Sequence, residues 1–286
     1  MFEPGFFTSG LLIGLREGVE AALIVAIVMA YLARTGNARY LGRIWLGVGA
    51  AIVLSFVLGA GLFISIGGLQ EPYEQLFEGL TMILAAAVVT WMLFWMRRQA
   101  ASVKGELHAA VDRALTSGGA WALTFLAFTA VIREGIETAL FLAGTATSAD
   151  AGATSVLVGA LAGLAMAALI GWGFYRGARV LDLRLFFKWT GIALIFIAAG
   201  LLSKAVHEFI EIGVIGIGTG TAFDVSAVLP HDGGIGQFLR AIFGYTSTPE
   251  WATLVVWAAY VIVVVVLYLR PIAPPAPRPA EAQPAA

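Results

Sequence analysis

The sequence contains no cysteine, which excludes disulfide bonds, iron–sulfur clusters and metal sites built from thiolates. It has only three histidines among 286 residues, so any metal site must take most of its ligands from oxygen atoms. Charged residues make up 12% of the chain, against about 25% in a soluble domain. Hydrophobic residues make up 60%, and the mean hydropathy is +0.90. This balance is typical of a polytopic membrane protein.

The first ten residues hold Glu3 and no lysine or arginine, and the apolar segment that follows contains Arg16 and Glu17. A signal peptide has a basic start and a short uncharged core, so we expect this segment to be a retained membrane helix. Hydropathy predicts an all-α fold with seven transmembrane helices within residues 1–270. The predicted spans are 6–33, 41–66, 76–96, 120–145, 155–180, 185–206 and 251–269. Residues 271–286 are rich in proline and alanine, which predicts a disordered cytoplasmic tail.

Basic residues gather on one side of the predicted bundle. Four segments, 34–43, 97–113, 176–188 and 270–278, hold thirteen of the 17 lysines and arginines. The positive-inside rule places these segments in the cytoplasm, and the N-terminus therefore outside. The opposite side has Arg240 as its clear loop cation and carries the acids Glu71, Glu74, Asp150, Glu208, Glu211, Asp224 and Asp232.

Two short segments nearly repeat each other. Residues 16–20 read Arg-Glu-Gly-Val-Glu, and residues 133–137 read Arg-Glu-Gly-Ile-Glu. Glycines at 47, 59 and 61 recur at 159, 171 and 173. Together these echoes predict two inverted three-helix repeats, about 6–98 and 118–212, followed by a seventh helix; inverted repeats are common in transporters that bind at mid-membrane. Small residues recur in any membrane helix, so the glycines alone leave the repeat open.

The repeated segments place ionisable side chains where they are costly, at about 2.5–3.5 kcal/mol each on insertion scales. In each segment the glutamates are spaced i, i+3 and share one helix face. Both segments are expected roughly 16 Å deep, near the middle of the bilayer core. Two helices crossing there would gather four carboxylates, from Glu17, Glu20, Glu134 and Glu137. We expect Gly18 and Gly135 to permit the close crossing.

The arginines of the two segments lower the charge of this predicted cluster. Arg16 can pair with Glu20, and Arg133 with Glu137, because each pair is spaced i, i+4. Four carboxylates and two guanidinium groups leave a net charge of about −2, which a divalent or trivalent cation would offset. Carboxylate oxygens suit hard cations such as Fe³⁺, Mn²⁺, Mg²⁺ or Ca²⁺. The alternative is a set of buried ion pairs that holds two helices together without a ligand, and that alternative leaves two glutamates unpaired.

A second group of candidate ligands lies at the outer ends of the third and sixth predicted spans. It comprises Glu78, His207, Glu208 and Glu211, with Glu71 and Glu74 close by in sequence. An acidic mouth would concentrate cations, so we interpret the group as a vestibule for the incoming ion, although solvated carboxylates at helix ends are equally common. Lys204 is spaced to pair with Glu208 or to reach outward. The long connection 213–250 is interpreted as a lid or docking surface, and Trp91 and Trp95 as interfacial anchors.

The doubled segment, at matching depth in two inverted halves, resembles the oxidase-dependent iron permease family. That family includes the permease of the yeast high-affinity iron uptake complex and bacterial EfeU-type permeases. Its hallmark is Arg-Glu-Gly-Leu-Glu in the first and fourth membrane helices, the REGLE motif, and here valine and isoleucine replace the leucine. The resemblance covers about residues 6–269.

The resemblance implies a transporter rather than an enzyme, with Fe³⁺ as its transported substrate and no permanently bound cofactor. It also implies a bacterial inner-membrane location and an extracytoplasmic oxidase or iron-delivering partner. Three alternatives remain: a permease or proton-coupled exchanger for another hard cation such as Mn²⁺, an intramembrane enzyme, and a sensor or partner subunit without transport. The missing cysteine and the absence of an intramembrane Ser–His pair argue against the enzyme.

Overall fold

The computed structural model describes residues 3–66, 73–99, 103–148, 152–177, 182–231 and 233–270. Within these ranges the regular secondary structure is helical, apart from an isolated bridge between Thr221 and Glu250, which confirms the all-α class. The α-helices are α1 (Pro4–Arg34), α2 (Leu41–Ile66), α3 (Tyr73–Gln99), α4 (Val103–Arg113), α5 (Gly119–Ser148), α6 (Ala153–Tyr175), α7 (Leu183–Glu211), α8 (Gly234–Phe243) and α9 (Trp251–Leu269). Two short helical segments, η1 (Ala38–Tyr40) and η2 (Ala114–Gly118), precede α2 and α5.

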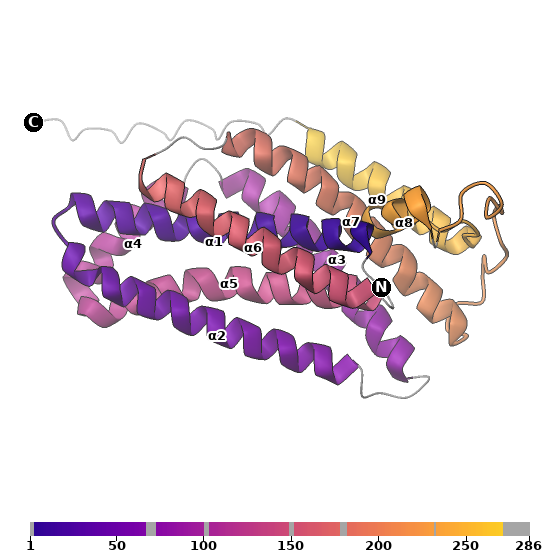
Figure 1. Ribbon diagram of the computed structural model, residues 1–286, viewed down its shortest axis with the longest axis horizontal. Coiled ribbons are helices and arrows are strands. Elements are labelled where there is room, and N and C mark those ends of the chain that lie inside the picture. The colour runs from indigo at the N-terminus through magenta and orange to yellow at the C-terminus, as the bar shows by residue number, and fades with distance from the viewer. Residues whose placement is uncertain are drawn as a thin grey trace, which may run out of the picture.

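The long helices form one elongated bundle with a short helix at either end, α4 at one and α8 at the other (Figure 1). We call these the α4 end and the α8 end. Five of the described helices, α2, α3, α6, α7 and α9, are long and apolar enough to cross a membrane. The two longest, α1 and α5, contain the repeated charged segments, which interrupt their apolar sequence. The chain is therefore a multi-pass membrane protein.

Helix boundaries follow the predicted spans closely, with two informative differences. Helices α2 and α9 begin and end where hydropathy placed them, whereas α6 ends at Tyr175 instead of 180. The turn after α6 contains Gly177 at φ +85, a left-handed conformation that ends a helix. Helix α7 extends to Glu211, beyond the predicted end at 206. His207, Glu208 and Glu211 therefore belong to a helix end rather than to a loop.

Hydropathy missed α4 and α8 for a physical reason. Helix α4 has the polar sequence VKGELHAAVDR, and α8 is only ten residues long, so neither has the length and apolarity of a membrane span. Tyr31 near the end of α1 holds α4 in place. Its hydroxyl donates to the carboxylate of Asp112 at 2.8 Å, and its ring stacks on His108 at 4.1 Å.

Close helix contacts organise the bundle. Helix α1 packs mainly on α6, α2 packs mainly on α5, and α3 packs on α7, which also contacts α9. At the α1–α6 contact a Cβ atom at Gly159 would overlap the carbonyl group of Phe7. At the α2–α5 contact a Cβ atom at Gly47 would overlap the carbonyl group of Thr124. Glycine is required at both positions because the two backbones meet there. Helices α1 and α5 also contact each other, which brings the repeated segments together.

Candidate functional site

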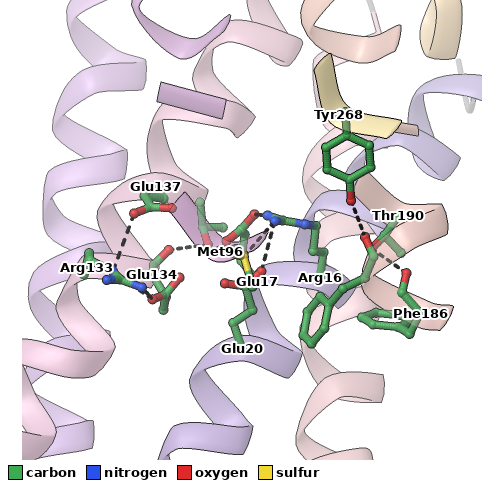
Figure 2. Close-up of polar contacts among 12 residues, drawn as sticks. Arg16, Glu17, Glu20, Met96, Arg133, Glu134, Glu137, Phe186, Thr190 and Tyr268 are labelled. Atoms are coloured by element: carbon green, nitrogen blue, oxygen red, sulfur yellow. Dashed lines mark hydrogen bonds and ion pairs between the residues drawn. The ribbon is translucent and has the colours of Figure 1, made fainter. Parts of the chain in front are cut away.

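The two repeated segments meet in the middle of the bundle. Glu17 is the fourteenth of the 31 residues of α1, and Glu134 is the sixteenth of the 30 residues of α5. Figure 2 shows the side chains of the two segments turned toward each other. All four glutamates are buried: Glu17 is 1% exposed, and Glu20, Glu134 and Glu137 are at most 6% exposed. The midpoint positions and the shared helix faces predicted from spacing agree with this arrangement.

Each arginine binds the glutamates of its own segment. Arg16 Nη1 donates to Glu17 Oε1 at 2.6 Å, and Arg16 Nη2 lies 3.2 Å from Glu20 Oε1. Arg133 Nη2 donates to Glu134 Oε1 at 2.6 Å, and Arg133 Nε lies 3.7 Å from Glu137 Oε1. The i, i+4 pairs expected from the sequence are present. The shorter contacts, however, join each arginine to the next residue, an arrangement that the spacing argument did not foresee.

Three of the four glutamates can hold a metal ion together. Glu17, Glu134 and Glu137 each offer a carboxylate oxygen, and these oxygens all lie within 4.8 Å of one another. We call this set the carboxylate triad. In the described part of the chain the Oε2 atoms of all three are buried and accept no hydrogen bond. A buried carboxylate oxygen without a donor is costly, and a bound cation would satisfy it. The donor set is made of oxygen only, which suits a hard or borderline cation.

Glu20 lies outside this triad. Its carboxylate is 6% exposed and lies beside Arg16, which is itself 1% exposed, although its Oε1, like the Oε2 atoms of the triad, accepts no hydrogen bond. The sequence predicted four equivalent carboxylates, whereas the structure places three at the common point and one in an internal ion pair. Spacing along the helix does not account for the difference, because Glu137 follows Glu134 at the same interval and does belong to the triad.

The two glycines of the repeated segments do not separate α1 from α5. A Cβ atom at Gly18 would overlap Ala167 of α6, and one at Gly135 would overlap Ser55 of α2. This corrects the expectation that they permit the crossing of the two charged helices. Each glycine follows a glutamate in the chain, so it points about 100° away around the helix and faces the neighbouring apolar helix instead.

Helix α3 contributes two adjacent side chains that the sequence argument did not place at the site. The thioether sulfur of Met96 accepts a hydrogen bond from Arg16 Nη2 at 3.0 Å (Figure 2). The guanidinium carbon of Arg133 lies 4.3 Å above the ring of Trp95, which is cation–π geometry. Trp91 is 58% exposed and suits the anchor role predicted for it, whereas Trp95 belongs to the site. An aromatic near a helix end gives no sequence signal that distinguishes these two roles.

The predicted vestibule residues are only partly assembled. His207 Nε2 lies 3.4 Å from Glu211 Oε1, whereas Glu208 is buried and pairs with Lys204 at 3.0 Å, as its spacing suggested. Glu78 is half-buried on α3, and the neighbouring Gly79 packs on Phe209 of α7. The predicted acids Glu71, Asp150 and Asp232 fall outside the described residues.

Glu250, at the start of α9, is the acid that sequence reasoning missed at this end. Its Oε1 lies 2.7 Å from His207 Nδ1, and its Oε2 accepts a hydrogen bond from Thr253 at 3.1 Å. Desolvation raises the pKa of Glu250, but hydrogen bonds from its own backbone amide, His207 and Thr253 outweigh that effect and lower the pKa overall. The two carboxylates near His207 contact opposite ring nitrogens, so they do not converge on one ion.

A polar cavity of about 290 Å³ opens beside this pair at the α8 end. Side chains from α7, α8, the long connection and the start of α9 line it, among them Lys204, His207, Arg240, Tyr245 and Glu250. The connection 213–250 is thus a folded structure that encloses a cavity, and its apolar part, predicted as 238–245, is largely the helix α8.

Comparison with known proteins identifies relatives of this sequence along most of its length. Residues 8–273 match the family described as "Iron permease FTR1 family". The chain is 42% identical over 264 residues to a protein named ferrous iron permease EfeU from Escherichia coli O6:K15:H31, which covers 91% of this chain and 94% of the relative. It is 39% identical over 262 residues to the protein of the same name from Yersinia pestis, with 91% and 92% covered. No solved structure matches the chain significantly.

Proposed function

The chain belongs to the iron permease FTR1 family, and on that premise we propose that it imports iron through the carboxylate triad. One observation carries this proposal. Three buried carboxylates from two separate membrane helices converge within 4.8 Å, and each retains an oxygen without a hydrogen-bond donor. Ion pairs that served only to join α1 to α5 would run between the two helices, whereas each pair found here lies within one segment. Homologues named as permeases also make the chain a transporter, not an enzyme.

We further propose that the transmembrane domain consists of seven spans, with α1 and α5 added to the five apolar helices. Both are long enough, at 31 and 30 residues, and the charged side chains of their repeated segments are buried in the bundle, apart from the partly exposed Arg133. The basic segments near α4 and the acidic α8 end support an extracytoplasmic N-terminus and a cytoplasmic C-terminus in the inner membrane.

Two inverted repeats are supported by contacts that recur at constant offsets. Residues of α1 correspond to residues of α5 at an offset of 117, and residues of α2 correspond to residues of α6 at an offset of 112. By these offsets Phe7 corresponds to Thr124 and Gly47 to Gly159, and the contact of Phe7 with Gly159 is matched by the contact of Thr124 with Gly47. The same offsets relate two more pairs of contacts, Gly18 with Ala167 to Gly135 with Ser55, and Gly171 with Ala22 to Gly59 with Ala139. Each first helix therefore packs on the second helix of the other half. This exchange is the arrangement expected of repeats related by a two-fold axis.

The form of iron is the finest step of the proposal. An oxygen-only donor set and the net charge of the two segments favour Fe³⁺, delivered by an extracytoplasmic oxidase or iron-delivering partner. The relatives are named ferrous iron permeases, and that name favours Fe²⁺ as the second candidate. Ions would approach from the α8 end, where Glu78, Glu211 and the pair of His207 and Glu250 lie. Manganese remains the alternative cargo, since the same oxygens suit it.

The deciding experiment is radioactive iron uptake into proteoliposomes, with Fe²⁺ held by ascorbate and Fe³⁺ supplied as a weak chelate in separate reactions. We expect uptake of iron by the wild type and competition by Mn²⁺ only at large excess. Glu17→Ala should abolish uptake, whereas Glu106→Ala, an exposed position on α4, should keep it. Equal uptake by Glu17→Ala and the wild type would remove the triad from the pathway.

A further inference from the structure

The two arginines of the site are not equivalent, although their sequence contexts are nearly identical. Arg16 is 1% exposed and is enclosed by Glu17, Glu20 and the sulfur of Met96. Arg133 has a side chain that is 39% exposed and rests on the open face of Trp95. The two terminal nitrogens of Arg16 are thus held by buried partners, whereas Arg133 is partly exposed and less confined.

The two arginines also differ in how many of their glutamate partners belong to the carboxylate triad. It contains both carboxylate partners of Arg133, which are Glu134 and Glu137, but only one partner of Arg16. Arg133 contacts the Oε1 atoms of these two carboxylates, and their Oε2 atoms accept no hydrogen bond. A cation bound by the Oε2 atoms would therefore share both carboxylates with Arg133 and weaken their attraction for it. Arg16 keeps Glu20 as a partner that the triad does not use. Repulsion between the incoming cation and the guanidinium group of Arg133 also favours movement of Arg133 away from the triad, because both groups are positively charged.

We infer that Arg133 is a built-in counter-cation, which offsets part of the negative charge of the unloaded triad and is displaced across the face of Trp95 when iron binds. This inference rests on the proposed function and names its regulation. The face of Trp95 attracts a guanidinium group without carrying a charge, so it can hold Arg133 when the carboxylates are taken. The unloaded site is then partly compensated, so the empty protein can return to its outward-facing conformation without cargo. The pair of Arg16 and Glu20 holds the structure in both the loaded and the unloaded state.

The inference predicts a separation of two transport activities. Net uptake requires the empty protein to return from its inward-facing to its outward-facing conformation. Exchange of external labelled iron for internal unlabelled iron requires only that the loaded protein change conformation in both directions. Arg133→Gln leaves Glu134 and Glu137 without their arginine when the triad is empty, so net uptake should fall about 100-fold while exchange stays within about threefold of the wild type. Arg16→Gln removes a group needed in both states and should reduce both activities together.

Trp95 gives a second, milder test that does not alter a charge. Trp95→Leu removes the ring and should lower net uptake by roughly threefold to tenfold while leaving exchange unchanged, and Trp95→Phe should restore most of the loss. Trp91→Leu is the matched control, since Trp91 lies one turn away on α3, stacks on Trp95 at 6.2 Å and is 58% exposed. It should behave as the wild type.

Both assays use the full chain in proteoliposomes, with iron in whichever oxidation state the wild type transports. Equal loss of net uptake and exchange in Arg133→Gln would overturn the inference, and so would the selective loss in Arg16→Gln instead. If Arg133→Gln does not reach the membrane, the three tryptophan variants decide, and equal behaviour of Trp95→Leu and Trp91→Leu would overturn it. A wild-type protein that moves no iron in either assay contradicts the proposed function itself.

Discussion

Replacing Arg16 by methionine should destabilise the protein far more than the same change at Arg133. Arg16 is 1% exposed, and its nitrogens lie 2.6 and 3.2 Å from two carboxylates. At an effective dielectric constant of about 20, each contact has a gross attraction of about 5–6 kcal/mol, most of which offsets the desolvation of the charges. Removing one partner leaves a carboxylate uncompensated, and the net cost of that is about 3–5 kcal/mol. Arg133 has a side chain that is 39% exposed and its second pair is longer, at 3.7 Å, so fewer buried contacts are lost and the expected cost is about 1 kcal/mol.

The assay is thermal unfolding of the purified protein in detergent, followed by the loss of the monodisperse fraction on size exclusion. For a chain of this size, about 2–4 °C is expected per kcal/mol, so Arg16→Met should lower the midpoint by about 6–20 °C and Arg133→Met by less than about 4 °C. The double variant Arg16→Met with Glu20→Gln removes both charges of the internal pair and should recover part of the loss. Equal shifts for the two single variants would refute the reasoning, because their sequence contexts match and only their burial differs.

Three further outcomes follow from the contacts of the site and the bundle. Each of the triad changes Glu17→Gln, Glu134→Gln and Glu137→Gln should abolish iron uptake, while Glu20→Gln should reduce uptake less. Uptake kinetics would detect this difference, and equal losses in all four variants would contradict it. Because the pKa of Glu250 is lowered from its ordinary value of 4.5, the ionised carboxylate stabilises the α8 end at pH values above 4.5, and this contribution is lost as the pH falls through the folded-state pKa. Limited proteolysis of the 213–250 connection should therefore increase in acid for the wild type and change less for Glu250→Gln. Gly18→Val should force α1 away from α6 and lower the amount of protein in the membrane, whereas Gly61→Val should not, because a Cβ atom added at Gly61 has no neighbouring atom within 4 Å. Similar amounts of the two variants would show that the close α1–α6 contact is not required.

Hydropathy and charge patterning predicted most of the helices because a membrane span needs a long apolar run, and that requirement is local in sequence. Helices α2 and α9 begin and end where the pattern placed them. Helices α4 and α8 were not predicted, since a short or polar helix gains its stability from neighbours that a local window does not contain. The contact of Tyr31 with Asp112, 81 positions apart, is an example of such support.

The sequence by itself pointed to the charged residues of the candidate site, but not to Trp95 or Met96. Buried charges in an apolar helix are costly wherever the helix packs, so the repeated segments marked Arg16, Glu17, Glu20, Arg133, Glu134 and Glu137 before any fold was known. Which of the glutamates converge, and which stays with an arginine, depends on the tertiary structure. Whether a glutamate faces the shared point or an internal arginine depends on the rotation and height of α1 relative to α5, and the shielding of each arginine depends on α3. Two nearly identical segments thereby acquire different neighbours, Met96 for Arg16 and Trp95 for Arg133, because side-chain environment is set by packing between helices rather than by the order of residues within one.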